Sequence, residues 1–180
     1  MVKIGIAGRG GQGIVYLGRL IGSVALEMGL YSAVTSSYGA EVRGGTANCT
    51  VSISDEEIAS PVASEPEFVV AMNQPSFIKF QNLLQSGGLI LVNSSMVNIS
   101  SVRGDIEVIE VPTSELAEKL GNIKVANMVM LGAFIKVSNL VSFPTMLKNL
   151  REILGEGKSK FLKINEKALQ LGFNFLKEKG

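Results

Sequence analysis

The 180-residue sequence contains no histidine and only one cysteine, and both shortages limit the chemistry of the chain. Without histidine there is no imidazole general base, no serine–histidine triad and no histidine-ligated metal. The single thiol, Cys49, excludes a disulfide within the chain. It also excludes an iron–sulfur or zinc site built from the chain's own thiolates.

Charged and aromatic residues are also scarce, at 18% and 6%, and the formal net charge is +1. A charge this small gives no general attraction to nucleic acid, and so few aromatics argue against base-stacking platforms. The longest apolar stretch, Val125–Ile135, is too short to cross a hydrocarbon layer of about 30 Å. No signal-peptide pattern follows Lys3. We therefore expect a cytoplasmic chain with no nucleic-acid or membrane partner.

Hydrophobic residues make up 46% of the chain and glycines number twenty, which is typical of a well-packed α/β protein. The length suits one domain over residues 1–180. Periodicity and turn residues predict strands over 1–7, 31–36, 47–54, 68–72, 89–93 and 106–111, and helices over 14–28, 74–84, 113–120, 125–137, 144–154 and 163–177. Strands that alternate with helices predict a three-layer α/β/α sandwich with a Rossmann-like start. Its sheet should be mostly parallel, with one antiparallel strand.

The antiparallel strand is expected at residues 47–54, where apolar and polar side chains alternate strictly. Such alternation places one face on a core and leaves one polar face, as in an antiparallel or edge strand. The first 36 residues form a strand, loop, helix and strand, a unit expected to be parallel. Gly18 and Gly22 lie four residues apart in that helix and should let it approach the sheet closely.

A glycine loop, Gly8-Arg9-Gly10-Gly11-Gln12-Gly13, joins the first predicted strand to the first helix. Glycines in this context bring backbone N–H groups close to an anion at the positive end of the helix dipole. Arg9 and Gln12 add side-chain donors. The six residues are therefore a candidate cradle for a phosphate or pyrophosphate ligand, such as coenzyme A. The alternative is that the glycines only allow the helix and strand to pack closely.

A nicotinamide cofactor fits the loop less well. A dinucleotide fold usually carries an acidic residue at the end of its second strand, where it holds the ribose. The corresponding residues, 33–37, are Ala-Val-Thr-Ser-Ser and include no acid. The lysine and hydroxyl that end a P-loop are missing as well.

A second glycine-bearing loop precedes the alternating strand. It gathers an aromatic, an acid, a base and glycines in a short span: Tyr38, Glu41, Arg43, Gly44 and Gly45. Polar chemistry on such a backbone suits a loop that contacts a ligand or another chain. A surface turn with a local contact between Glu41 and Arg43 is the alternative interpretation.

Three further residues have two interpretations each. Asn73 follows a buried strand, where it could contact a ligand or simply form the turn before Pro75. Asn127 lies in an apolar helix, and a structural hydrogen bond is the preferred explanation. Cys49 lies on the apolar face of its strand and is best explained as a small core residue. From Lys148 onward the chain is rich in lysine, a pattern typical of a solvated helix face or of a docking patch for an acidic partner.

Five segments in order make the chain resemble the gamma subunit of the 2-oxoacid:ferredoxin oxidoreductases. They are GRGGQG at 8–13, SYGAEVRGG at 37–45, SDEEI at 54–58, AMNQP at 71–75 and NMVMLG at 127–132. The segment RGGTAN at 43–48 looks more like the 2-oxoglutarate and branched-chain members than the pyruvate members. The resemblance covers nearly the whole chain.

The resemblance implies a multi-subunit enzyme that decarboxylates a 2-oxoacid, reduces ferredoxin and delivers the acyl group to coenzyme A. Thiamine diphosphate, Mg and iron–sulfur clusters would belong to the partner subunits, alpha, beta and delta. This chain would be an accessory subunit, inactive alone, with no catalytic or metal-binding residue of its own. By position, residues 8–13, Arg43 and Asn73 would approach coenzyme A, and Tyr38, Glu41, Gly44 and Gly45 would shape the subunit junction. The rival hypotheses are a free-standing nucleotide-binding enzyme and a purely structural scaffold.

Overall fold

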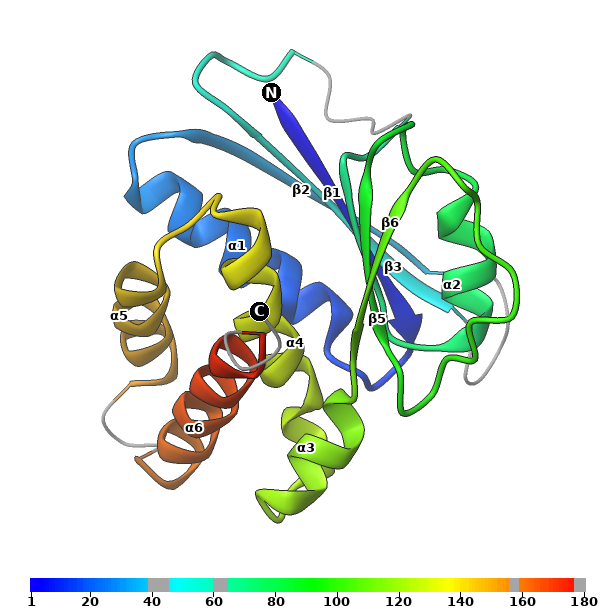
Figure 1. Cartoon of the computed structure of the whole chain (residues 1–180). Helices are drawn as coiled ribbons and strands as arrows, with labels where there is room; N and C mark the ends of the chain where they lie inside the picture. The colour runs from blue at the N-terminus through cyan, green and yellow to red at the C-terminus, as the bar shows by residue number, and fades with distance from the viewer. Residues whose placement is uncertain (39–45, 60–64, 156–158, 177–180) are drawn as a thin grey trace.

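The computed structural model describes residues 1–38, 46–59, 65–155 and 159–176, and within them six strands form one sheet. The strands are β1 (Val2–Arg9), β2 (Tyr31–Tyr38), β3 (Thr46–Ser54), β4 (Phe68–Ala71), β5 (Leu89–Asn93) and β6 (Glu107–Val111). The helices are α1 (Ile14–Glu27), α2 (Gln74–Gln81), α3 (Thr113–Lys119), α4 (Ala126–Ser138), α5 (Phe143–Leu154) and α6 (Ser159–Phe175), with a 3-10 turn at Ile123–Val125. The expected α/β architecture is confirmed (Figure 1).

The sheet has the order β2-β3-β1-β4-β5-β6, and β1, β4, β5 and β6 are parallel. β3 runs antiparallel to both of its neighbours, β1 and β2. The predicted antiparallel strand is therefore confirmed, and it lies inside the sheet rather than at its edge. β2 runs in the same direction as β1, as expected for the first unit. The two strands are not neighbours, because β3 lies between them.

Helix α1 covers the apolar face of β3 at very short range. A Cβ atom added to Gly18 would lie 2.3 Å from the Cys49 sulfur, and one added to Gly22 would lie 2.6 Å from Val34. Real side chains do not approach this closely, so the two glycines are required for the contact. The expectation that they let the helix lie close to the sheet is confirmed.

The helices are divided unequally between the two faces of the sheet. In Figure 1, α2 stands alone on one side, and the other helices gather on the opposite side. α2 packs through Phe77 on a small core that includes Val69 and Ile90. The larger core joins the other face of the strands to α1, α4, α5 and α6. The sandwich therefore has three layers, but the layer that contains α4 is backed by further helices.

Helices α4 and α6 cross with their backbones in contact. A Cβ added to Gly132 would lie 2.0 Å from the carbonyl oxygen of Leu169, and one added to Gly172 would lie 1.8 Å from that of Val129. α6 begins at Ser159, four residues before the predicted start at Lys163. Its first turn was missed because Phe161, 63% exposed, breaks the inward apolar stripe. Within the described residues, no helix is both long and apolar enough to span a membrane.

Candidate functional site

A cleft of about 610 Å³ opens at the carboxyl ends of β1, β4 and β5. Its lining comes from the glycine loop (9–12), Met72 after β4, Ser95 and Met96 after β5, the first turns of α3 (Ser114, Glu115, Glu118) and the segment before and into α4 (Ile123, Lys124, Ala126, Asn127). The chain leaves β1 toward the β2 edge and leaves β4 toward the β6 edge. The cleft therefore lies at a topological switch point, where open α/β sheets bind ligands.

The glycines of the loop serve two different purposes. Gly8 is buried, and an added Cβ would lie 2.6 Å from the Gln12 side chain. Gly13 has φ 75° and caps α1, and an added Cβ would lie 2.2 Å from the Asn127 amide nitrogen. Gly10 and Gly11, in contrast, have no atom within 4 Å of an added Cβ. Gly8 and Gly13 thus allow close packing, while Gly10 and Gly11 present bare backbone to the cleft.

The beginning of α1 has donor groups without acceptors inside the helix. Its N-cap residue, Gly13, offers no side chain to accept from the N–H groups of the first turn. Those N–H groups and the aligned peptide dipoles give the helix end a partial positive charge. The side chain of Asn127 lies directly against Gly13, and its Oδ1 accepts a hydrogen bond from the backbone N–H of Met128 at 2.9 Å. The structural hydrogen bond expected for Asn127 is present, and the residue also lines the cleft.

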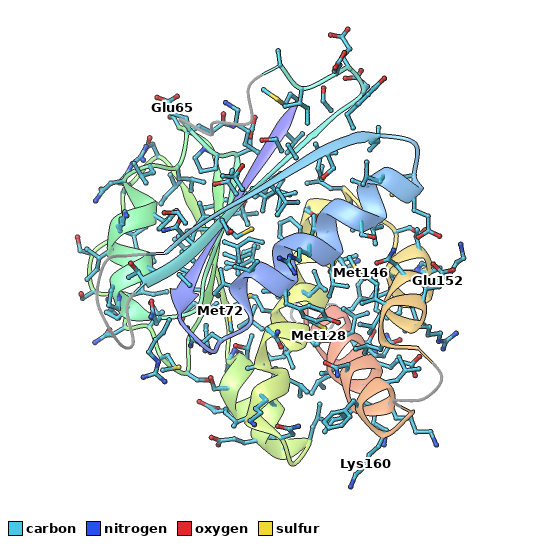
Figure 2. The ribbon with its side chains drawn as sticks, turned by 180° about the vertical axis from the view of Figure 1, so that it is seen from behind. Glu65, Met72, Met128, Met146, Glu152 and Lys160 are labelled. Carbon is cyan, nitrogen blue, oxygen red and sulfur yellow. The ribbon has the colours of Figure 1, made fainter. Side chains whose placement is uncertain are left out.

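Gln12 holds the loop to the sheet. Its Oε1 accepts a hydrogen bond from the backbone N–H of Arg9 at 2.7 Å. Its Nε2 donates to the carbonyl oxygen of Met72 at 3.2 Å and contacts the Met96 sulfur at 3.6 Å. Figure 2 shows Met72 beside the end of β1, where the loop begins. Both N–H groups of the Gln12 amide are engaged in this way, so Arg9, Gly10 and Gly11 are the loop residues free to face a ligand.

The opposite wall of the cleft depends on a buried asparagine that sequence reasoning missed. Asn93 ends β5 and is fully buried. Its Nδ2 donates to the Ser114 hydroxyl at 2.9 Å, and its Oδ1 accepts from the Ser114 N–H at 3.4 Å. The Ser95 hydroxyl accepts from the N–H of Glu115 at 3.2 Å. The polar residue that directly follows the apolar run of β5 was the available signal for this wall.

The cleft is lined by side chains of both charge signs. Arg9 lies in the glycine loop and Lys124 in the turn between α3 and α4, whereas Glu115 and Glu118 lie on α3. An anion in the cleft would be attracted by the two basic side chains and by the start of α1, and repelled by the two carboxylates.

Asn73 caps α2 instead of lining the cleft. Its Oδ1 accepts a hydrogen bond from the N–H of Ser76 at 3.1 Å, and Pro75 occupies the first turn. Of the two interpretations drawn from the sequence, the turn-forming one describes this contact. Cys49 is 1% exposed, and its burial raises the pKa of the thiol to about 11. The interpretation of Cys49 as a small core residue is confirmed.

The structure does not test the predictions made for the second glycine-bearing loop, because Glu41, Arg43, Gly44 and Gly45 lie outside the described residues. Tyr38 ends β2, and the register pairs its backbone with Ala47. On the other side of β3, the pairing with β1 places Thr46 opposite Arg9. The two residues that flank this loop therefore lie at the same edge of the sheet as the glycine loop.

The chain is similar to known proteins over its whole length. Residues 3–175 match the family described as pyruvate ferredoxin/flavodoxin oxidoreductase. The chain is 33% identical to the ketoisovalerate oxidoreductase subunit VorA of Methanothermobacter thermautotrophicus over 98% of its own length, and it spans only 37% of that relative. It is 39% identical to the 2-oxoglutarate synthase subunit KorC of Methanothermobacter marburgensis, over 78% of this chain and 79% of the relative.

Two solved structures share the fold. The gamma subunit of a keto/oxoacid ferredoxin oxidoreductase from Geobacter sulfurreducens has a TM-score of 0.82 and 29% identity, and 97% of each chain is covered. A 2-oxoglutarate:ferredoxin oxidoreductase from Magnetococcus marinus, with 2-oxoglutarate, coenzyme A and succinyl-CoA bound, has a TM-score of 0.89 at 23% identity. The match covers 98% of this chain and 31% of that one. At that identity, the second likeness shows the fold alone.

Proposed function

The chain belongs to the pyruvate ferredoxin/flavodoxin oxidoreductase family, and from that membership we propose that it is the gamma subunit of a 2-oxoacid:ferredoxin oxidoreductase. The observation that carries the proposal is the full-length match to a solved gamma subunit, together with the relatives VorA and KorC. The complex would oxidatively decarboxylate a 2-oxoacid, transfer the acyl group to coenzyme A and reduce ferredoxin. The higher identity to KorC makes 2-oxoglutarate the first substrate to test.

The proposal assigns the chemistry to partner subunits. Alpha and beta subunits would bind thiamine diphosphate and Mg, and a delta subunit would carry iron–sulfur clusters and pass electrons to ferredoxin. A chain with one cysteine and no histidine cannot provide such ligands from its own thiolates and imidazoles. This chain would work in the cytoplasm as an accessory subunit without a catalytic residue of its own.

Its own contribution would be to help hold coenzyme A. The bare backbone of Gly10 and Gly11 and the first turn of α1, to which the N-cap residue Gly13 offers no side-chain acceptor, would donate N–H groups to a phosphate. Arg9 and Lys124, which line the same cleft, would supply positive charge. Gln12 and Asn127 would keep the loop and the helix end in position. Arg43 and Asn73 stay predicted contacts of the same ligand, and Tyr38, Glu41, Gly44 and Gly45 stay predicted residues of the subunit junction.

The strand order argues against a free-standing nicotinamide enzyme. In a dinucleotide fold the second strand lies beside the first, so that its end reaches the ribose. Here β3 separates β2 from β1, which moves the end of β2 one strand farther from the glycine loop. The missing acid in residues 33–37 agrees with this geometry.

Gly10→Asp tests the phosphate cradle. The new side chain has open space around it, so the fold should persist, and its carboxylate would face the phosphate. In the complex purified with its partner subunits, we expect the KM for coenzyme A to rise at least about fivefold, since two like charges a few ångströms apart repel by at least about 1 kcal/mol. Gly104→Asp is the matched control, because Gly104 is exposed and also has no atom within 4 Å of an added Cβ.

The two parts of the proposal fail in different ways. If both variants keep the wild-type KM for coenzyme A, the chain is a structural scaffold and the cradle assignment is wrong. If the tagged chain purifies from its host under oxygen-free conditions without iron–sulfur partners and without 2-oxoacid-dependent dye reduction, the subunit assignment is wrong.

A further inference from the structure

A second pocket, of about 420 Å³, lies where the start of α6 meets the end of α3. Its lining is Leu120, Asn122, Lys160, Phe161, Lys163, Ile164 and Lys167. We refer to it as the α6 pocket. Figure 2 shows Lys160 at the outer tip of α6, pointing away from the body of the molecule. The turn at 121–125 separates the α6 pocket from the cleft, since Leu120 and Asn122 line the pocket while Ile123 and Lys124 line the cleft.

Three lysines line one side of the α6 pocket beside a group of apolar residues. Lys160, Lys163 and Lys167 are exposed and are spaced three and four residues apart, so they share one face of α6 over about 10 Å. Leu120 and Ile164, which line the same pocket, are half-buried. Phe161 is 63% exposed. Exposed aromatic side chains are enriched at the centres of protein–protein contacts.

In the part of the chain that the structure describes, these three charges have no carboxylate partner. Within the described residues, the basic side chains of neighbouring α5 have carboxylate partners: Arg151 pairs with Glu166 at 2.6 Å, and Lys148 pairs with Glu27 and Glu152. No ion pair joins Lys160, Lys163 or Lys167 to any carboxylate of that same part of the chain. Like charges at such spacings destabilise a helix. The arrangement therefore costs stability in the free chain, which points to a use outside it.

We propose that the α6 pocket docks an acidic segment of a partner protein that carries an apolar side chain. Carboxylates of the segment would pair with the three lysines, and its apolar side chain would cover Leu120, Ile164 and Phe161. A face of about 10 Å matches three or four extended residues or two helical turns. A compact patch without an arginine fork, on a chain of net charge +1, favours a carboxylate-rich protein over nucleic acid. The inference does not depend on the proposed function.

The test uses the full chain and a fluorescein-labelled acidic peptide with a leucine–phenylalanine pair between runs of glutamate. Fluorescence anisotropy gives its Kd for the wild type and for two double variants. Lys163→Glu/Lys167→Glu reverses the pocket charge, and Arg19→Glu/Lys79→Glu makes the same change in net charge at exposed sites on α1 and α2. We expect the pocket variant to bind at least about tenfold more weakly and the control variant to bind as the wild type does.

Phe161→Ala tests the apolar part of the contact. We expect it to weaken peptide binding several-fold. Ile78→Ala removes an apolar side chain that is 54% exposed from α2 and should have no effect. Urea unfolding checks the fold. The midpoint of Lys163→Glu/Lys167→Glu should lie near that of the wild type, because the variant exchanges a repulsion between two lysines for a similar repulsion between two glutamates.

Three results would overturn the proposal. The first is equal binding by the two double variants. The second is equal affinity for a peptide in which alanines replace the leucine–phenylalanine pair. The third is tighter binding of inorganic pyrophosphate or of a single-stranded oligonucleotide at the same lysines, which would assign the α6 pocket to a different ligand.

Discussion

Gly172→Ala places a methyl group where α4 and α6 touch. We expect this single added carbon to lower the free energy of unfolding clearly. The new Cβ would lie 1.8 Å from the carbonyl oxygen of Val129. The closest ordinary C···O contacts are about 3.3 Å, so the two backbones would have to separate by roughly 1.5 Å. Overpacking of a close-packed interior costs about 1–3 kcal/mol, occasionally more, and the carbonyl of Val129 is backbone, which cannot move aside as a flexible side chain can. The better helix propensity of alanine returns about 1 kcal/mol.

The expected net loss is therefore about 2 kcal/mol in the free energy of unfolding, or roughly 4–8 °C in Tm for a chain of this size. Urea unfolding followed by circular dichroism measures it. Gly104→Ala is the control, because that glycine is exposed, has no atom within 4 Å of an added Cβ and should change stability by less than about 0.5 kcal/mol.

A double variant sharpens the test. Gly132→Ala would place a Cβ 2.0 Å from the carbonyl oxygen of Leu169, at the same crossing. Either change forces the helices apart, so the double variant should cost clearly less than the sum of the two single changes. A Gly172→Ala chain as stable as the wild type, or strictly additive costs, would show that the two helices do not pack at this distance.

Two further predictions concern the cap and the thiol. Asn73→Ala should cost about 1 kcal/mol of stability because α2 loses its cap, whereas Asn73→Ser keeps a capping hydroxyl and should cost a few tenths. If Asn73→Ser also leaves the KM for coenzyme A unchanged in the complex, the predicted ligand contact of Asn73 is wrong. Burial raises the pKa of Cys49 from 9.0 to about 11, so the folded chain holds that proton more tightly than the unfolded chain. This contribution to stability is complete below about pH 9 and is lost as pH rises toward 11, up to about 2 kcal/mol. Cys49→Ala should lack that loss in urea unfolding across this range, and a thiol reagent at about pH 8 should label Cys49 only after unfolding. Rapid labelling of the native chain would contradict its burial.

Much of the fold could be predicted because the relevant signals are local. The alternation in residues 47–54 identified an antiparallel strand, since a strand with one apolar and one polar face is typical of antiparallel sheets, whereas parallel strands are usually apolar on both faces. Gly18 and Gly22, one helical turn apart, indicated the close approach of α1. The glycine loop between a strand and a helix located one side of the cleft, because a parallel strand always delivers its following loop to the carboxyl edge.

What the sequence left open depends on which segments become neighbours. Period-two alternation does not specify a partner strand, so only the folded chain shows β3 between β1 and β2. The roles of two similar asparagines were decided in the same way: Asn73 caps α2, whereas Asn93 builds a wall of the cleft. Gly132 and Gly172 are forty positions apart and meet only at a helix crossing. Local periodicity determined the elements and the faces they bury, whereas the contacts between distant elements exist only after the chain has packed, and those contacts form the rest of the site.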